Sequence, residues 1–402
     1  MSEILLLTIS GSDHPGVTAA FTTALSGHAV NILDIGQSVI HDRLNLGMLL
    51  EVPEGDESGP VMKELLFLAH KHDLKTNFSP IDEIEYENWV HSEGKPRYIA
   101  TLLGRKLSAD NIGHLSAIAA KHGLNIDSIT RLSGRFSLTD NNRHKRACVE
   151  FSMRGEARDE ELLRRDLLAI TQDDEVDLAF QADDIFRRHR RLVVFDMDST
   201  LIQCEVIDEL AKAAGTGEEV MAITEAAMRG EIPFNESFER RLATLEGLSE
   251  DVLIDIANNL PITEGADRLI TTLKKLGYKV GILSGGFSYF ANYLKERWDL
   301  DCISANELDI VDGKLTGRVK GEIVNGEKKA ERLRQMAAQY GVDMQQTVAV
   351  GDGANDLPML AIAGLGVAFH AKPLVRKSAR HSISTLGLDG ILYLLGVRDR
   401  EV

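Results

Sequence analysis

Residues 192–200 read Leu192-Val193-Val194-Phe195-Asp196-Met197-Asp198-Ser199-Thr200, an apolar strand that runs directly into two carboxylates. From there on, apolar segments alternate with amphipathic helical patterns, and further strands are expected at 279–283, 347–350 and 365–369. This alternation predicts an α/β fold with a doubly wound parallel sheet, a Rossmann-like core. Residues 206–262 are mostly helical and predict a cap over the strand ends, where such sheets bind their ligands.

Polar motifs also follow two later strands of this pattern. The strand at 279–283 ends in Ser284-Gly285-Gly286, and the strand at 347–350 ends in Gly351-Asp352-Gly353-Ala354-Asn355-Asp356. A hydroxyl and small backbone units can cradle phosphate oxygens, and Lys329, at the start of a helix, can add a point charge. Alone, each motif is more often a tight turn or a solvated helix start. Their occurrence in order at strand ends predicts one phosphate-handling site.

The carboxylates at these strand ends suit a divalent cation and phosphoryl transfer. Magnesium prefers hard oxygen ligands, which Asp196, Asp198 and Asp352 can supply. An aspartate can attack phosphorus and form an aspartyl-phosphate, and a second carboxylate can protonate the leaving alcohol and later take a proton from water. The pattern therefore predicts a magnesium-dependent phosphatase, whereas a lone acidic strand end would only cap the next helix.

The four motifs together resemble the haloacid dehalogenase superfamily of aspartate-nucleophile phosphotransferases, and residues 192–395 look like the phosphoserine phosphatases within it. The resemblance implies Asp196 as the nucleophile, Asp198 as the general acid and base, and Mg²⁺ held by Asp196, Asp352 and the backbone carbonyl of Asp198. It also implies hydrolysis of O-phospho-L-serine to L-serine and phosphate, the last step of L-serine biosynthesis.

Substrate choice depends on groups outside the phosphate site. Phosphoserine offers an ammonium and a carboxylate, and the resemblance implies Glu205 for the first and Arg241, rather than Arg240, for the second. From the residues alone, Glu205 could equally cap a helix and Arg241 could form a surface ion pair. The other substrate-site positions that the resemblance implies are Met228, Phe234, Ser284, Gly285, Lys329 and Asn355.

The N-terminal half contains a weak internal repeat, because a strand, turn and helix that begin near Ile4 recur from Tyr98 onward. The first turn, Gly11-Ser12-Asp13-His14-Pro15-Gly16, resembles the ligand loop of ACT domains, which are ferredoxin-like βαββαβ units that bind amino acids. The resemblance implies a regulatory amino-acid site at Asp13 and Gly16, with L-serine as the candidate ligand, and a homodimer. A tight turn without a ligand is the alternative. The second turn, Gly104-Arg105-Lys106-Leu107-Ser108, lacks Pro-Gly, which argues against a ligand there.

Three domains follow from these patterns: two ACT-like domains at 1–87 and 97–182, and a haloacid dehalogenase-type phosphatase domain at 190–402 with its cap at about 206–262. The polar stretch 88–95 is expected to be a linker. The basic run Arg187-Arg188-His189-Arg190-Arg191 is too short for a nucleic-acid patch and is expected to be a solvated helix end.

Composition excludes several classes of function. The 402 residues include 45 basic and 62 acidic ones, a net charge of −17, which argues against nucleic-acid or anionic membrane partners. The N-terminus has Glu3 where a signal peptide needs basic residues, and no 18-residue apolar stretch occurs. Three widely spaced cysteines lack metal-binding spacing, so we expect a cytoplasmic protein with reduced thiols.

Two alternative functions remain open from the sequence. One is a phosphatase or phosphotransferase that acts on another small phosphomonoester. The other is an amino-acid-sensing regulatory protein whose phosphatase half is inactive, although the presence of Asp196, Asp198, Lys329 and Asp352 argues against it.

Overall fold

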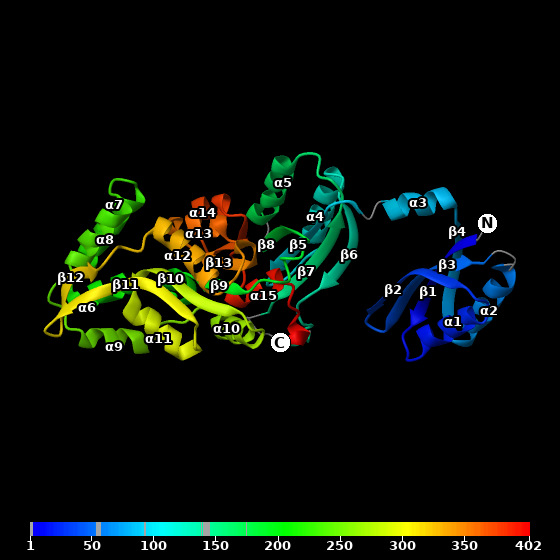
Figure 1. The fold of residues 1–402 in the computed structure, drawn as a ribbon, viewed down its shortest axis with the longest axis horizontal. Coiled ribbons are helices and arrows are strands. Elements are labelled where there is room, and N and C mark those ends of the chain that lie inside the picture. Colours follow the sequence, from blue (N-terminus) through cyan, green and yellow to red (C-terminus); the bar gives the residue numbers. More distant parts are fainter. Residues whose placement is uncertain (1–2, 54–57, 92–93, 138, 140–144, 174) are drawn as a thin grey trace. The chain divides into compact units, whose positions relative to one another are not determined.

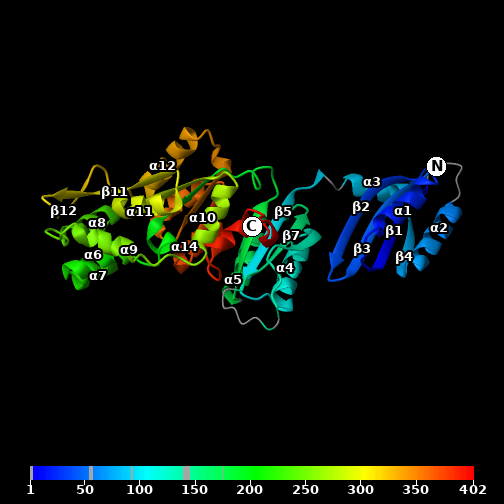
Figure 2. The same ribbon diagram turned by 90° about the horizontal axis from the view of Figure 1, so that it is seen from below.

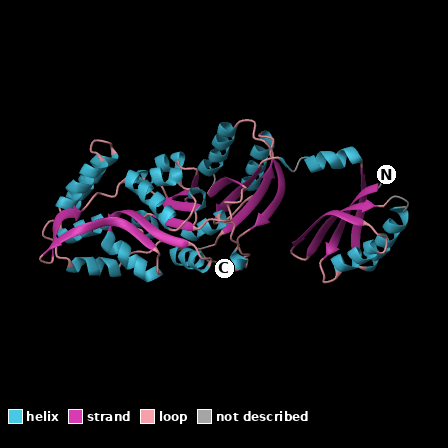
Figure 3. Ribbon diagram, viewed as in Figure 1, coloured by secondary structure: helices cyan, strands magenta, loops and turns pink. Residues whose placement is uncertain are grey.

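The structure is a computed structural model that describes residues 3–53, 58–91, 94–137, 139, 145–173 and 175–402. The chain divides into two compact bodies, Met1–Lys95 and Pro96–Val402. Three sheets carry the fold, two of four strands and one of seven (Figure 3).

The first ferredoxin-like unit is an antiparallel sheet of strand order β2-β3-β1-β4 (Figure 1). Alternate residues of β1 face the helices, so Leu5, Leu7 and Ile9 are buried against Phe21 of α1. Its elements are β1 (Glu3–Ser12), α1 (Val17–Ser26), β2 (Asn31–Ile40), β3 (Arg43–Val52), α2 (Ser58–Lys71) and β4 (Leu74–Ile81), followed by α3 (Glu83–His91).

The second ferredoxin-like unit repeats this order as β6-β7-β5-β8. Helices α4 and α5 lie next to each other beside its strands (Figure 2). Its elements are β5 (Arg97–Gly104), α4 (Ala109–Lys121), β6 (Asn125–Arg131), β7 (Ala147–Arg154), α5 (Glu160–Asp173) and β8 (Val176–Ala182). The weak sequence repeat therefore corresponds to two copies of one βαββαβ topology.

The seven-stranded core has the strand order β12-β11-β10-β9-β13-β14-β15, in which only the β11–β12 pair is antiparallel. The strands expected at 192–195, 279–283, 347–350 and 365–369 are confirmed, while β11, β12 and β15 were not expected. The strands are β9 (Leu192–Phe195), β10 (Lys279–Phe287), β11 (Cys302–Val311), β12 (Lys314–Lys320), β13 (Thr347–Gly351), β14 (Leu365–Phe369) and β15 (His381–Ile383).

Helices connect these strands, and the first four α-helices after β9 form the expected helical insert. The insert contains α6 (Val206–Ala214), α7 (Gly217–Met228), α8 (Phe234–Ala243) and α9 (Asp251–Asn258). The remaining helices are α10 (Ala266–Lys275), α11 (Ser288–Trp298), α12 (Gly326–Gln339), α13 (Leu357–Ile362), α14 (Pro373–Ser378) and α15 (Ile391–Leu394).

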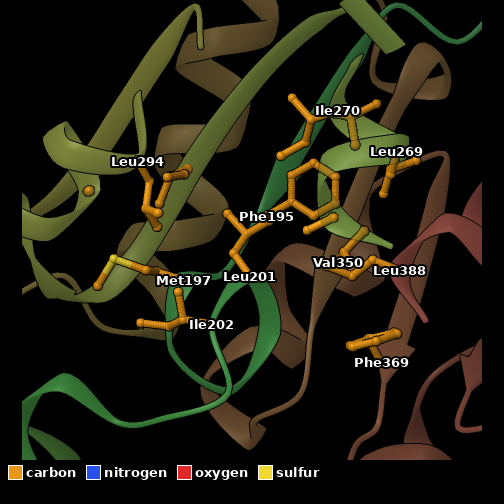
Figure 4. Packing of buried hydrophobic residues seen from close by; sticks show 14 of the residues in the cluster. Phe195, Met197, Leu201, Ile202, Leu269, Ile270, Leu294, Val350, Phe369 and Leu388 are labelled. Atoms are coloured by element: carbon orange, nitrogen blue, oxygen red, sulfur yellow. The ribbon is translucent and has the colours of Figure 1, made fainter. Parts of the chain in front are cut away.

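Strand β9 lies at the centre of the main hydrophobic cluster. Phe195 and Val350 come from adjacent strands and pack with Leu201 and Ile270, all with no more than 1% of their surface exposed (Figure 4). A central strand covered on both faces is uniformly apolar, which is why residues 192–195 contain no polar side chain. This packing holds the first residue after the strand, Asp196, at a fixed position.

The second ferredoxin-like unit is docked on the seven-stranded core. Its Leu103 and Ala179 belong to the same hydrophobic cluster as Phe195. Asp177 of β8 accepts hydrogen bonds from the backbone N–H groups of Ser384 and Thr385, each at 2.8 Å. This docking makes Pro96–Val402 one compact body.

Two connecting segments were interpreted from the sequence. In the first, residues 88–91 belong to α3, which buries no residue, and residues 92–93 lie outside the described part of the chain; the boundary between the two bodies follows Lys95. The basic run at 187–191 is not a solvated helix end, because Arg187 and Arg190 are buried. Arg187 donates a hydrogen bond to Glu150 of the second ferredoxin-like unit, so part of the run belongs to the docked surface.

Within the described residues, no helix has both the length and the apolar character that crossing a membrane requires.

Candidate active site

The segment after β9 turns sharply and carries two carboxylates. Asp196 is 4% exposed, and Ser199 adopts a left-handed backbone conformation with φ of 56°, which is uncommon for a residue with a side chain. The Ser199 hydroxyl donates to Glu205 at 2.8 Å, and the Asp198 carboxylate accepts from the N–H of Val206 at 3.0 Å. These contacts connect the turn to the start of α6.

Burial raises the pKa of Asp198 well above its ordinary value, and the negative charges of Glu205 and Asp196 act in the same direction. A carboxyl group with a raised pKa retains a proton that it can donate. Asp198 lies two residues after Asp196, which is the less exposed of the two.

Lys329 lies fully buried in the first turn of α12, where its Nζ is 2.7 Å from a carboxylate oxygen of Asp196 and 2.7 Å from one of Asp356. The side chain of Asn325 starts this helix by accepting from the N–H of Lys328 at 3.1 Å. Burial alone would lower the pKa of Lys329, but the two carboxylates raise it above its ordinary value. The lysine is therefore a permanent positive charge at the site.

Asp196, Asp352 and Asp356 each contribute an oxygen to a group whose atoms lie within 4.8 Å of one another. Burial and the neighbouring carboxylates raise the pKa of Asp352 to about 8 and that of Asp356 to about 7, although Lys329 opposes both shifts. One lysine is not enough to neutralise three clustered carboxylates. The donor set is therefore one that a hard divalent cation fits.

Asp356 is a site residue that the sequence analysis missed, although the motif containing it was recognised. It is fully buried, and its carboxylate also accepts from the N–H of Gly353 at 2.9 Å. The available signal was the second acidic residue of that motif. The side chain of Asp198, by contrast, is not part of the acidic cluster.

The loop after β10 approaches the carboxylates closely. A Cβ atom on Gly286 would lie 2.2 Å from an oxygen of Asp198, so a larger residue does not fit there without movement. Ser284 is fully buried, and its hydroxyl accepts from the N–H of Gly286 at 2.9 Å. Asn306 supports the loop by donating to the carbonyl of Gly285 at 2.7 Å.

The helical insert meets the core at this loop. A Cβ atom on Gly285 would lie 3.6 Å from the ring of Phe234 and 3.9 Å from the amide nitrogen of Asn355. Three of the predicted substrate residues therefore converge from α8, β10 and the loop after β13. Met228 is 62% exposed, and its sulfur lies 3.6 Å from the side-chain nitrogen of Lys372.

Arg241 and Glu205 are opposite charges beside the carboxylate pair. Burial lowers the pKa of Arg241, while the charges of Glu205, Asp208 and Asp198 oppose this shift. Burial also raises the pKa of Glu205. The hydrogen bond from Ser199 and the positive charge of Arg241 oppose this rise. Glu205 is the residue before α6 but makes no side-chain cap hydrogen bond to it. The geometry thus gives Glu205 no role as a helix cap.

Arg240 is unlike its neighbour. It is exposed, and it forms an ion pair with Glu236 one helical turn earlier. Arg241 alone of the two interacts with Glu205 and Asp198. Burial and charge therefore separate two arginines that are adjacent in sequence.

The candidate regulatory loop lies in the first ferredoxin-like unit. Asp13 is exposed, and Gly16 precedes α1 with φ of 95°, a conformation that favours glycine. No side chain caps α1, whereas Ser108 and Asn111 form a capping box at the equivalent helix α4. The N–H groups at the start of α1 are thus left for another partner, and those of α4 are partly satisfied within the chain.

Two family models match the chain: an ACT domain over residues 3–79 and a haloacid dehalogenase-like hydrolase over residues 190–364. A phosphoserine phosphatase of Streptomyces coelicolor is 42% identical over 99% of this chain and 93% of its own length. A second, named phosphoserine phosphatase SerB2, from Mycobacterium tuberculosis, is 41% identical over 99% of this chain and 94% of its own length.

Solved structures agree with these matches. A probable phosphoserine phosphatase from Vibrio cholerae is 37% identical with a TM-score of 0.57, over 74% of this chain and 86% of that one. A haloacid dehalogenase family hydrolase from Salmonella enterica is 29% identical with a TM-score of 0.64, over 74% of this chain and 98% of that one. Given similarity over nearly its full length, the chain belongs to the phosphoserine phosphatases of the haloacid dehalogenase-like hydrolase family that carry an N-terminal ACT domain.

Proposed function

We propose that this chain hydrolyses O-phospho-L-serine to L-serine and phosphate, the last step of L-serine biosynthesis. The observation that carries the proposal is the pair of opposite charges, Glu205 and Arg241, beside the carboxylates Asp196 and Asp198. Glu205 matches the ammonium of the substrate and Arg241 matches its carboxylate. The names of the whole-length relatives support the same substrate.

In the first step, a carboxylate oxygen of Asp196 attacks phosphorus and the bond from phosphorus to the serine oxygen breaks. Asp198, whose pKa is raised by burial and by the charges of Glu205 and Asp196, gives its proton to the departing serine oxygen. Lys329, 2.7 Å from Asp196, neutralises charge on the phosphoryl group. The loop Ser284-Gly285-Gly286 offers a hydroxyl and N–H groups to its oxygens.

In the second step, water attacks the phosphorus of the aspartyl-phosphate and Asp196 leaves as a carboxylate. Asp198 is then unprotonated and accepts a proton from that water, which restores the starting state. The ring of Phe234, close to Gly285, covers the site and limits the entry of other water.

We also propose that Mg²⁺ is held by Asp196, Asp352 and the backbone carbonyl of Asp198, with Asp356 close by. When bound, the ion stabilises negative charge that develops on the phosphoryl oxygens. The excess of carboxylates over lysine in this cluster supports the assignment. A chelator should abolish turnover and added Mg²⁺ should restore it.

The specificity assignment is tested with two substrates and two adjacent arginines. O-phosphoethanolamine has the ammonium of phosphoserine but lacks its carboxylate. Arg241→Ala should lower kcat/KM for phosphoserine roughly 100-fold, the effect of a lost charged hydrogen-bond pair, and should change that for phosphoethanolamine much less. Arg240→Ala, the matched control, should stay within about twofold of the parent for both. Equal losses on both substrates in Arg241→Ala would contradict the assignment.

The same assay separates the other open function, action on a different small phosphomonoester. If a panel of phosphomonoesters contains a compound with higher kcat/KM than phosphoserine, and Arg241→Ala leaves that value unchanged, the chain acts on that compound instead.

L-serine is also our proposed regulatory ligand, bound at Asp13 and Gly16. The uncapped start of α1 supports a carboxylate ligand there, because helix N-terminal N–H groups favour anions. L-serine should change the rate and protect α1 from hydrogen exchange. If Asp13→Ala and Gly16→Val leave both effects unchanged, the ligand binds elsewhere.

A homodimer is proposed through the first ferredoxin-like unit. The edge strand β2 exposes Ile32, Ile35, Val39 and Ile40 by 38–71%, and an apolar edge strand favours pairing with another copy. Light scattering should give a dimer that Ile35→Lys converts to a monomer.

A further inference from the structure

A cavity of about 340 Å³ lies between the second ferredoxin-like unit and the seven-stranded core. Helix α5 and strand β8 form one wall, and the segment before β9 together with β15 contributes to the other. We call it the interface cavity. Its volume lies in the range of small-molecule sites, and none of its lining residues belongs to the candidate active site.

Three buried polar atoms of its lining residues have no hydrogen-bond partner among the described residues: Oε1 of Gln181, Nε of Arg190 and Nδ1 of His381. Each of these residues is at most 8% exposed. Other atoms of two of them are bonded, since Gln181 donates to the carbonyl of Leu394 at 3.1 Å and Arg190 donates to that of Gln345. Unpaired buried polar atoms are costly, so three from separate elements around one cavity indicate a missing partner.

Positive charge predominates among the charged residues that line the interface cavity. Arg164, Arg190 and Arg380 line it, against the two carboxylates Glu160 and Asp184. Arg164 also donates to the backbone carbonyl of Ala379 at 3.2 Å, which holds it at the cavity wall. An anion is therefore favoured over a cation here.

The lining of the cavity also includes apolar side chains. Leu163, Leu167 and Leu178 are buried, and the rings of Tyr98 and Phe180 are stacked with their centres 5.1 Å apart. A fully hydrated inorganic ion gains nothing from such a wall. An organic molecule gains from burying apolar surface against it.

We propose that the interface cavity binds a small organic carboxylate with an apolar body. Arg190 and Arg380 hold the carboxylate, and the apolar body lies against Phe180 and Leu167. Because one wall belongs to the ferredoxin-like unit and the other to the core, a bound ligand stabilises their docking.

The test uses the full-length protein and 3-phenylpropionate as the probe, in titration calorimetry. We expect saturable binding of one molecule per chain, and at least tenfold weaker binding of the neutral 3-phenylpropanamide. No saturable binding of the carboxylate up to about 10 mM, a concentration at which even weak millimolar sites fill, would mean that water occupies the cavity and would overturn the proposal.

Variants locate the binding. Arg380→Glu reverses an exposed charge of the cavity rim and should raise Kd at least tenfold. Arg188→Glu, also exposed but not part of the cavity lining, should leave Kd within about twofold. Ala182→Trp, which adds a large ring at an exposed residue of the lining, should abolish binding. Arg241→Ala should not affect it, because that residue belongs to the active site; a Kd that responds to Arg241→Ala and not to Arg380→Glu would overturn the proposal.

Discussion

The two ferredoxin-like units have the same strand order, but the outer faces of their sheets have different surroundings. In the first unit, the side of β1 away from the helices carries Thr8, which is exposed. In the second unit, every residue of β5 from Ile99 to Gly104 is buried, because the seven-stranded core covers that outer face. One topology can therefore form a separate body or become part of a larger one.

The neighbouring strands β4 and β8 differ in the same way. Gly11 pairs with Leu74 in the first sheet, and Gly104 pairs with Val176 in the second, so Lys75 and Asp177 occupy equivalent positions. Lys75 is exposed, whereas Asp177 is fully buried and bonded to the core. A buried carboxylate that accepts from two backbone N–H groups and from the hydroxyl of Thr385 specifies docking in a way that a solvated lysine does not.

Truncation should give the largest contrast between the two units. A chain starting at Pro96 should stay soluble and keep kcat/KM for phosphoserine within about threefold, since the first body has its own core. A chain starting at Arg190 loses Leu103, Leu132 and Ala179 from the main cluster and should lose nearly all soluble, active protein. Size-exclusion chromatography and phosphate release measure both. Equal behaviour of the two truncations would contradict the comparison.

The equivalent pair Asp177 and Lys75 should differ next most strongly. Asp177→Ala leaves the N–H groups of Ser384 and Thr385 without their acceptor and should lower the free energy of unfolding of the Pro96–Val402 body by about 3 to 5 kcal/mol. Lys75→Ala should cost no more than about 0.5 kcal/mol in its own body. Hydrogen exchange followed by mass spectrometry reports on each body separately. A small effect of Asp177→Ala would mean that the hydrophobic contacts alone hold the docked unit.

Acid should weaken the docked body through His381. Burial, with the positive charges of Arg380, Arg164 and Arg190, lowers the pKa of His381 from 6.5 to about 4. The unfolded chain therefore binds this proton more readily between pH 6.5 and pH 4, and the free energy of unfolding should fall by about 3 kcal/mol over that range. Above pH 6.5 the histidine contributes no pH dependence.

The variant His381→Gln tests this pH dependence. Urea unfolding at several pH values should show a smaller loss of stability in acid for His381→Gln than for the parent. The same slope in both proteins would show that other groups cause the acid sensitivity.

The smallest expected effect concerns the helix starts. Ser108→Ala removes the capping box of α4 and should lower the stability of the docked body by about 1 kcal/mol. The equivalent helix α1 has no side-chain cap to lose. Differential hydrogen exchange should show faster exchange at the start of α4 in Ser108→Ala; an unchanged rate would mean that Asn111 alone is sufficient.

Much of the fold could be predicted because strong local patterns mark it. Residues 192–195 are uniformly apolar and end in polar residues, and the same holds for 347–350. The docking could not be predicted in the same way, because it depends on which partner covers an outer face. The run Ile99-Ala100-Thr101-Leu102-Leu103, apolar except for Thr101, was an available signal, since a strand covered on one face alternates. Arg187 and Arg190 were misinterpreted for the same reason: their partners are distant in sequence.

The candidate site also contains residues that the sequence predicted and one that it did not. Asp196, Asp352 and Lys329 were predicted from motifs at strand ends and helix starts, and the fold brings them together. Asp356 was not singled out, because its contact with Lys329 depends on the path of the loop after β13. That loop is tight: a Cβ atom on Gly351 would lie 2.4 Å from the Asp356 carboxyl group. The resemblance implied Arg241 rather than Arg240, and the two differ in the structure: Arg240 pairs with Glu236, whereas the charges of Glu205 and Asp198 act on Arg241.

The central claim is that Asp196 carries the phosphoryl group during turnover of phosphoserine. The most direct measurement is to quench the full-length enzyme during turnover, reduce it with borohydride, which converts an aspartyl-phosphate to homoserine, and locate the modified residue by mass spectrometry. We predict homoserine at position 196 and unmodified aspartate at 198, 352 and 356, with no modification and no turnover in Asp196→Asn. Turnover that continues in Asp196→Asn, or modification at another aspartate, would contradict the account.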